Sequence, residues 1–289
     1  MKRKPVKLFL RAAWLAVTGR FVSRAEIASD YDRISAKYDE NFSRHASVQS
    51  DALIDGIDGL REDARILDLA CGTGAVAAAW RRRFPKAHIT GVDASDGMLE
   101  VARRRCPDVE FSRGDMDSVL ASVPDASLDA VSCAWAIGYA DPRRIAREAF
   151  RALRPGGVFA VVENRRDTWP QVRNAAFGVA AEMPESLTAL MDLHLRLPKS
   201  ATSLGRMSRR AGFSGVETWE GMDSLVFADG RKVLDWSLGT GVSAGFDRAM
   251  DPARRLECDA VFVRLVERGM TPEGIRLDHM FVFAKGVKR

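Results

Sequence analysis

The sequence of 289 residues is poor in the residues that build metal sites and disulfide frameworks. It holds only four histidines and four cysteines, Cys71, Cys106, Cys133 and Cys258, which lie far apart and form no Cys-x-x-Cys pair. Structural zinc sites and small secreted proteins depend on closely spaced cysteines and histidines. We therefore expect no metal, no disulfide framework and a reducing, cytoplasmic location.

An excess of positive charge is missing from most of the chain. Seven of the 44 Lys and Arg residues precede the first acid, Glu26. The remaining 37 stand against 39 Asp and Glu residues, so the net charge of +5 becomes −2 without that first segment. Proteins that bind nucleic acids usually carry an excess of positive charge that binds the phosphates. Because the chain after this segment has no such excess, we expect no nucleic-acid partner.

The chain also has no run of the ~20 apolar residues that a membrane span needs. Its first segment, "KRKPVKLFLRAAWLAVTGR", instead predicts a basic amphipathic helix within residues 1–27, with Lys4 and Lys7 on one stripe and Phe9 and Trp14 mostly elsewhere. Because Arg11 interrupts the apolar part, a secretory signal is disfavoured. Two interpretations stay open: the helix packs on the protein's own substrate cap, which we favour, or residues 2–24 dock peripherally on a membrane.

The stretch "ILDLACGTG", residues 66–74, predicts a buried strand that ends near Asp68 and turns at Gly72 and Gly74. The next stretch, "AVAAAWRRRF", is rich in helix formers and has arginines near its carboxyl end, as the helix dipole favours. A strand, a Gly-x-Gly turn and a helix together are typical of the first unit of a nucleotide-binding α/β sheet.

Between Ala64 and Glu163 short apolar runs alternate with helical segments, which predicts a parallel sheet with right-handed crossovers. Ligands bind such sheets at the carboxyl ends of the strands. Three acids occupy successive strand ends: Asp68, Asp93 and Asp115. An acid 19 residues after Gly74 suits the ribose hydroxyls of an adenosine, and Asp115 suits the adenine amine. Capping of the following helix is the alternative for Asp93, although Ser95 serves as well.

Four stretches, "ILDLACGTG", "GVDASDGML", "GDMDSV" and "ALRPGGVFAVVE", resemble the successive motifs of class I S-adenosylmethionine-dependent methyltransferases. The resemblance is strongest to the branch of ubiquinone, menaquinone and small-molecule methyltransferases. A dinucleotide dehydrogenase would more often carry a third glycine where this chain has Ala77. The resemblance implies an α/β fold: a doubly wound, mostly parallel seven-stranded sheet, Rossmann-like, with a helical lid and cap insertions.

The resemblance also implies which residues hold S-adenosylmethionine. The upstream stretch "IASDYDRISAKYDENF" resembles a lid in which Tyr31 and Tyr38 lie two helical turns apart, and one or both of them would donate to the cofactor carboxylate. Core packing is the alternative for both tyrosines. Asp68 would lie near the methionine ammonium and Asp93 at the ribose. The full expected set is Tyr31, Tyr38, Asp68, Ala70, Gly72, Thr73, Gly74, Asp93, Ala94, Met98, Asp115, Met116, Ala134 and Trp135.

A base for the methyl acceptor is harder to identify, because methylation of an amine or thiol needs none. The candidates are His194, His279 and Tyr139, with His45 as a further histidine. The expected activity is transfer of a methyl group to a small, partly apolar acceptor such as a natural product, a phenol or a quinone precursor. The alternatives are a membrane-surface lipid or quinone methyltransferase and a catalytically inactive cofactor-binding scaffold.

The chain is expected to have three parts: the N-terminal helix in 1–27, the lid and cofactor-binding core in 28–163, and acceptor cap insertions with the last two strands in 164–289. The helical, Met- and Leu-rich segments of the last part predict an apolar acceptor pocket, with core packing as the alternative for each side chain. These side chains are Met183, Leu187, Met191, Leu195, Trp236 and Leu238. A monomer and a homodimer are equally compatible with the sequence.

Overall fold

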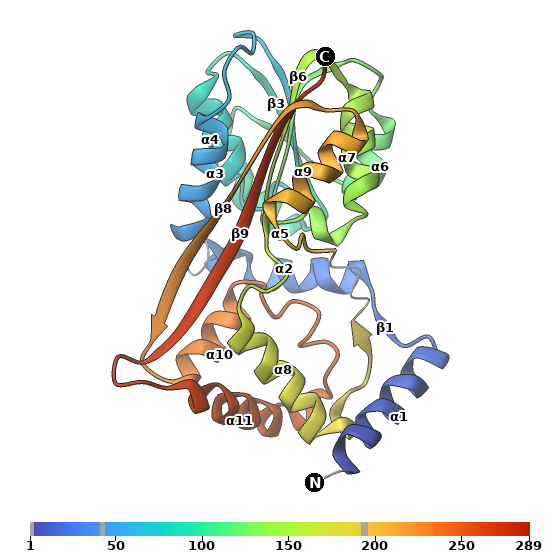
Figure 1. Ribbon diagram of the computed structural model, residues 1–289, viewed down its shortest axis with the longest axis vertical. Helices are drawn as coiled ribbons and strands as arrows, with labels where there is room; N and C mark the ends of the chain where they lie inside the picture. Colours follow the sequence, from blue (N-terminus) through green and yellow to red (C-terminus); the bar gives the residue numbers. More distant parts are fainter. Residues whose placement is uncertain (1–2, 41–43, 192–195) are drawn as a thin grey trace. The chain divides into compact units, whose positions relative to one another are not determined.

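The computed structural model describes the backbone of residues 3–40, 44–191 and 196–289 and the side chains of residues 6–40, 48–191 and 196–289. The chain forms two compact units. The sheet unit comprises residues 35–168, 194–222 and 280–289, and the helical unit comprises residues 1–34, 169–193 and 223–279. Both units draw on the C-terminal part of the chain (Figure 1).

The sheet has seven strands in the order β4-β3-β2-β5-β6-β9-β8. The strands are β2 (Arg65–Leu69), β3 (His88–Asp93), β4 (Glu110–Arg113), β5 (Leu128–Ala134), β6 (Leu153–Asn164), β8 (Ser214–Phe227) and β9 (Ile275–Val287). The five neighbouring strands β4, β3, β2, β5 and β6 pair in parallel in that order, and β9 pairs antiparallel with β6. The predicted fold class, a mostly parallel seven-stranded sheet, is confirmed.

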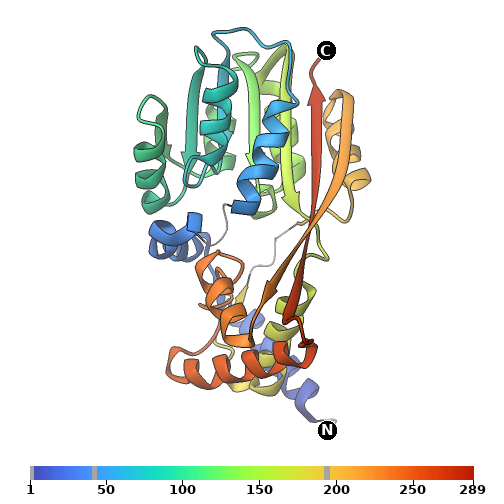
Figure 2. The ribbon, with the colours of Figure 1, turned by 90° about the vertical axis from the view of Figure 1, so that its left-hand side faces the viewer.

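Helices cover both faces of this sheet, as the side view shows (Figure 2). One core contains Leu120 of α6 (Met116–Ser122), Ile145 of α7 (Pro142–Ala152) and Leu204 of α9 (Ala201–Ala211). A second core contains Leu53 of α3 (Arg44–Asp55) and Trp80 of α4 (Ala75–Arg83). Alternate residues of β2 and β5 enter opposite cores, which is why these strands read as unbroken apolar runs. Helix α5 (Asp96–Arg105) follows β3.

The helical unit is built from α1 (Arg3–Val17), most of α2 (Arg24–Tyr38), α8 (Pro170–Glu182), α10 (Gly230–Gly239) and α11 (Arg255–Val266). Strands β1 (Phe21–Val22) and β7 (Leu190–Met191) form a short parallel pair. The helical segments expected in residues 164–289 are interrupted in the structure. Helix α8 ends before Pro184, which cannot continue it, and the segment between α10 and α11 turns at Gly241 and Gly245, both with positive φ.

The apolar side chains assigned to an acceptor pocket pack together in the core of the helical unit. Met183, Leu187 and Trp236 are buried there, and Met191 and Leu238 pack partly buried against them. Leu195 lies outside the described residues. Core packing, the alternative considered for each of these side chains, therefore describes the five that the structure places.

No helix within the described ranges is long and apolar enough to span a membrane.

Candidate functional site

Asp68, near the carboxyl end of β2, is a buried carboxyl group with one oxygen unused. Its Oδ1 accepts a hydrogen bond of 2.7 Å from the Ser132 hydroxyl, which itself accepts from Trp80 Nε1 at 2.9 Å. Its Oδ2 is buried and has no partner in the described part of the chain. Burial raises the pKa of Asp68 to about 7, although the Ser132 hydrogen bond opposes the shift. An unpaired buried carboxyl oxygen is costly, so a cationic donor here would be bound favourably.

The loop after β2 has the strained geometry of a ligand-binding turn. Ala70, Gly72 and Gly74 all have positive φ, of 51°, 52° and 80°. Such values are unfavourable for a residue with a side chain, and in non-glycine residues they cluster at functional sites. A Cβ at Gly72 would meet nothing within 4 Å, whereas one at Gly74 would lie 3.1 Å from Ala102 Cβ. Gly74 thus permits close helix packing, and Gly72 leaves the backbone open for close approach of a ligand.

Asp93 connects this loop to the loop after β3. Its Oδ2 accepts from the Gly72 backbone N–H at 2.9 Å and its Oδ1 accepts from the Ser95 N–H at 2.9 Å. Ser95 itself caps α5, because its hydroxyl accepts from the Met98 N–H at 3.1 Å. The capping alternative therefore belongs to Ser95. Met98 is buried and Ala94 is exposed beside Asp93.

Asp115, the third acid of the series, is the N-cap of α6. Its carboxylate accepts from the backbone N–H groups of Asp117 at 3.0 Å and Ser118 at 3.4 Å. Met116 follows it with a buried side chain. This capping accounts for an acid at this position without a ligand, so the adenine contact of Asp115 stays a prediction.

The turn after β5 carries two more predicted residues, Ala134 and Trp135. Trp135 has a φ of 61°, its backbone N–H donates to Val162 O at 2.7 Å, and its indole N–H donates to the Ser50 hydroxyl at 3.1 Å. The backbone of Trp135 therefore adopts a conformation that is rare for non-glycine residues. The indole hydrogen bond to Ser50 holds the ring in place. Ala134, the last residue of β5, is partly buried.

Glu163 is a buried carboxyl group that the sequence analysis missed. It lies near the end of β6, and it accepts from the Gly138 N–H at 3.1 Å and from the Asn164 N–H at 2.7 Å. Burial raises the pKa of Glu163 to about 7, while these hydrogen bonds oppose the shift. Through Gly138 the carboxylate holds the short helix η2 (Ile137–Tyr139), which carries Tyr139. Its position at a strand end, like those of the predicted acids, was the available signal.

Tyr38, at the end of α2, lies among these acids. Burial, and then the neighbouring Tyr139, Asp93, Asp39 and Glu163, raise the pKa of its hydroxyl, which therefore stays protonated as a hydrogen-bond donor. The structure thus brings Tyr38 together with two residues that the sequence assigned to the site or to catalysis, Asp93 and Tyr139.

The next residue, Asp39, fastens the end of α2 to the glycine loop. Its Oδ1 accepts from the Thr73 hydroxyl at 2.7 Å, and its other oxygen pairs with Arg105 of α5. Arg105 also donates to the Thr73 carbonyl at 3.0 Å. These contacts hold the Tyr38 end of the predicted lid against the sheet unit.

Two of the remaining candidates, Tyr31 and His279, are described within the helical unit. Tyr31 belongs to the helical unit, where its ring packs so closely on Gly241 that a Cβ there would lie 2.6 Å from it. His279 is buried in the same unit and stacks on Trp169, with ring centroids 4.4 Å apart. His194 lies outside the described residues, as does the side chain of His45. Among the candidate bases that the structure describes, Tyr139 belongs to the sheet unit and lies next to Tyr38.

Cys71 in the glycine loop is a buried thiol whose surroundings disfavour the nucleophilic thiolate form. Burial, and then the charges of Asp68 and Asp93, raise the pKa of this thiol well above its ordinary value. Within the described ranges, no three His, Cys, Asp or Glu side chains are grouped as a metal site.

Taken together, the sheet, its Gly-x-Gly turn and the acids at the strand ends define a nucleotide-binding site of the Rossmann-like class. Residues 66–157 match the family described as the methyltransferase domain. The chain is 30% identical over 198 residues to a trans-aconitate 2-methyltransferase of Variovorax paradoxus, 65% of this chain and 72% of that protein. It is 40% identical over 100 residues to a demethylmenaquinone methyltransferase of Thermotoga maritima, 34% of this chain and 43% of that protein.

Among solved structures, the YcgJ protein of Bacillus subtilis superposes with a TM-score of 0.55 at 19% identity, covering 84% of this chain and 99% of that one. Across the first three curated relatives the chain spans between 43% and 72% of their lengths. The chain belongs to the S-adenosylmethionine-dependent methyltransferases. Members of this family take the methyl group that they transfer from S-adenosylmethionine.

The residues of the sheet unit fit this cofactor. The orphaned Asp68 Oδ2 suits the cationic ammonium of the methionine part, and the open face of Gly72 leaves room for it. Asp93 already accepts two backbone N–H groups, but each carboxylate oxygen has a second lone pair with which to accept from a ribose hydroxyl. Tyr38 supplies a protonated hydroxyl for an anionic carboxylate.

The buried Glu163 should make stability depend on pH. Its folded pKa of about 7 is raised above the ordinary value of 4.5, so the stability that its protonated form contributes is present below pH 4.5 and is lost as pH rises through 7. From pH 5 to pH 8 the unfolding free energy of Glu163→Gln should therefore improve relative to wild type, by at most about 3 kcal/mol. Urea unfolding at both pH values measures this.

The exposed Glu217 provides the control for that experiment, since Glu217→Gln should leave the pH dependence as it is in wild type. Equal pH dependence in wild type and Glu163→Gln would contradict the raised pKa of Glu163.

Proposed function

We propose that this protein transfers the methyl group of S-adenosylmethionine to a small, partly apolar acceptor, such as a natural product, a phenol or a quinone-like compound. The observation that carries the proposal is the orphaned carboxyl oxygen of Asp68, buried next to a strained glycine loop that Asp93 holds in place. Bound there, the cofactor supplies an electrophilic methyl group on a sulfonium. No buried side chain of this group is a ready nucleophile, which suits direct transfer to an acceptor.

The protein's own part in this reaction is to orient and to exclude water. Methyl transfer from a sulfonium disperses charge, so holding donor and acceptor in line is the main requirement. Asp68 would hold the ammonium, Asp93 the ribose hydroxyls and Tyr38 the carboxylate, with Asp115 and Met116 at the adenine. Trp135, fixed by its two hydrogen bonds, would limit the position of the donor end.

The acceptor side of the reaction rests on fewer residues. We propose that residues 164–289 supply an acceptor cap, and that Tyr139 orients or deprotonates an acceptor hydroxyl when one is present. His279 and His194 stay alternative bases. The trans-aconitate relative, by its name, acts on a small acid, which favours a small acceptor for this chain.

A membrane-held lipid or quinone is a second candidate acceptor. The demethylmenaquinone methyltransferase among the relatives favours it by its name. We propose a cytoplasmic location in either case, because the four cysteines are all unpaired thiols. A screen of candidate acceptors with isotope-labelled S-adenosylmethionine tests the function directly. Label transferred to no acceptor of either class, from a chain that binds the cofactor, would favour the remaining alternative of an inactive scaffold.

Tyr38→Phe should weaken S-adenosylhomocysteine binding and slow turnover. The substitution removes one buried hydroxyl donor without changing the ring, and a lost buried hydrogen bond costs about 0.5–1.5 kcal/mol. Calorimetry on wild type and variant measures the affinity. Tyr139→Phe is the matched control, since its hydroxyl is assigned to the acceptor and its loss should leave cofactor affinity unchanged. Full affinity and rate in Tyr38→Phe would show that the ring only packs.

A further inference from the structure

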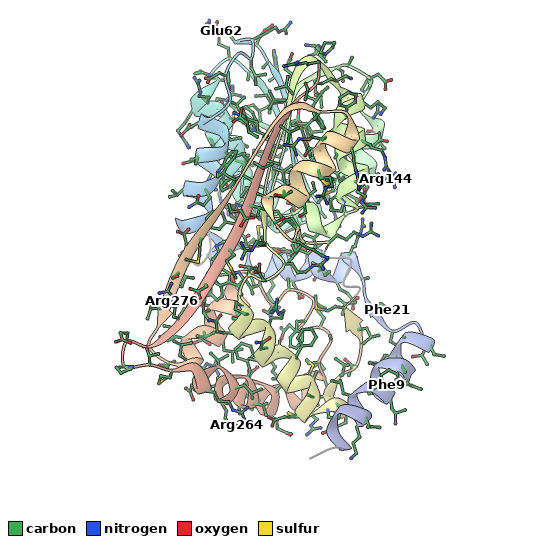
Figure 3. All side chains as sticks on the ribbon, viewed as in Figure 1. Phe9, Phe21, Glu62, Arg144, Arg264 and Arg276 are labelled. Carbon is green, nitrogen blue, oxygen red and sulfur yellow. The ribbon has the colours of Figure 1, made fainter. Side chains whose placement is uncertain are left out.

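Helix α1 packs against the helical unit with one side and exposes apolar side chains on the other. On its inner side Leu15 is fully buried in the core of the helical unit, and Arg11 Nε donates to the Leu187 carbonyl at 2.7 Å. On the outer side are apolar residues with exposed fractions of 46% to 88%, namely Val6, Phe9, Leu10, Trp14 and Val17. Figure 3 labels Phe9 on this helix and the similarly exposed Phe21 on β1. Leu15 thus packs in the core of the helical unit, whereas Trp14 and Val17 are exposed.

The exposed residues form one continuous stripe. With a step of 100° per residue, positions 6, 9, 10, 14 and 17 fall within an arc of about 140°, opposite to Leu15. Exposed apolar residues scattered singly over a surface need no explanation, but a stripe of this size on one helix marks an interaction surface. We call these five residues the outer stripe.

Cations border the outer stripe. The guanidinium groups of Arg11 and Arg20 lie 4.7 Å and 5.5 Å from the Trp14 ring centroid. Lys7, the residue after Val6, is also exposed. No acid precedes Glu26 in the sequence. The carboxylate of Glu185, which pairs with Arg254, also lies near Lys7. A surface that combines exposed aromatic and aliphatic side chains with an excess of cations complements a partner that is apolar inside and anionic at its edge.

We propose that the outer stripe docks α1 in the interface of an anionic membrane, with its apolar side chains among the acyl chains and its cations at the lipid headgroups. Amphipathic helices with Trp, Phe and Leu on one face and Lys and Arg beside them bind in this way. A second copy of the chain fits less well. A twofold contact through the stripe would bring Lys7, Arg11 and Arg20 of both copies together, with no acid on α1 to pair with them. This docking is independent of methyl transfer.

Co-sedimentation with vesicles tests the proposal on the full chain. We expect binding to vesicles of phosphatidylcholine with phosphatidylglycerol, weakening as salt rises from about 0.05 to 0.5 M, because lipid charges are screened. The triple variant Phe9→Gln, Leu10→Gln, Val17→Gln keeps every charge and the buried Leu15, and its binding should fall at least about tenfold. Deletion of residues 2–24 is a poorer test, because it removes Leu15 from the core.

The control is Leu256→Gln, a substitution of an 82% exposed leucine on α11, which should bind vesicles like wild type. Affinity for S-adenosylhomocysteine, measured on every variant, should stay unchanged, so failure of docking and failure of the cofactor site are distinguishable. Absence of vesicle binding by wild type at low salt, or unchanged binding by the triple variant, would overturn the proposal. So would a concentration-dependent dimer in light scattering that the triple variant abolishes.

Discussion

Asp93→Ala is expected to weaken binding of S-adenosylmethionine and S-adenosylhomocysteine by about 1.5–3 kcal/mol, roughly 10- to 150-fold in Kd. The variant loses the acceptor of the ribose hydroxyls. It also frees the Gly72 N–H, now bonded at 2.9 Å, and with it the position of the glycine loop. Titration calorimetry at constant pH and salt measures the change.

Two further variants separate these effects. Asp93→Asn keeps one carbonyl oxygen for a backbone N–H and an amide that can still bond a hydroxyl, so its loss of affinity should be smaller than that of Asp93→Ala. Asp96→Ala removes an exposed carboxylate three residues away, which pairs with Arg113 at 2.7 Å, and should leave affinity unchanged. Wild-type affinity in a folded Asp93→Ala would refute the ribose assignment.

Asp68→Asn is expected to lower cofactor affinity at pH 7.5 by about 2–5 kcal/mol, because one partner of a buried charge pair is removed. Wild-type affinity should also depend on pH. The carboxyl group has a pKa of about 7 before the ligand binds, and only its ionised form pairs with an ammonium. Affinity should therefore rise as pH increases from 5.5 to 7.5, by up to about tenfold per pH unit at the acid end.

The pH dependence distinguishes this pairing from simple damage to the core. Asp68→Asn should bind weakly with a flat pH profile. Asp129→Asn, which alters another carboxylate, buried at the start of β5, should keep the wild-type profile. A wild-type profile that is flat, or that falls with rising pH in this range, would contradict an ammonium at Asp68.

The sheet and its glycine turn could be predicted from the sequence because local patterns determine them. Strands that are buried on both faces appear in the sequence as apolar runs. A glycine after such a run, as at Gly72, predicts a turn, and the structure gives Gly72 a positive φ. The helical unit was less predictable. Its helices are stabilised by packing between residues far apart in the chain. The sequence therefore predicted helical segments there but not that α8 ends before Pro184 or that the chain turns at Gly241 after α10.

Within the site, the sequence could predict which residues lie at the strand ends but not which hydrogen bonds their side chains form. The sequence placed Asp68 and Asp93 at strand ends but could not show that one Asp68 oxygen is unpaired or that Asp93 bonds Gly72. The sequence indicates Glu163 only as part of an apolar strand, because it does not show that the fold brings the Gly138 N–H to its carboxylate. The exposed side of α1 was undecided for the same reason: amphipathicity gives two faces but not the one that packs inward.

Titration of the wild-type protein with S-adenosylhomocysteine and, separately, with NAD at pH 7.5 tests most directly that the sheet unit is a methyl-donor site. We expect S-adenosylhomocysteine to bind with a Kd at the micromolar level, about −8 kcal/mol, and NAD not to bind. Binding of NAD with equal or higher affinity, or no binding of S-adenosylhomocysteine by the folded protein, would contradict the account.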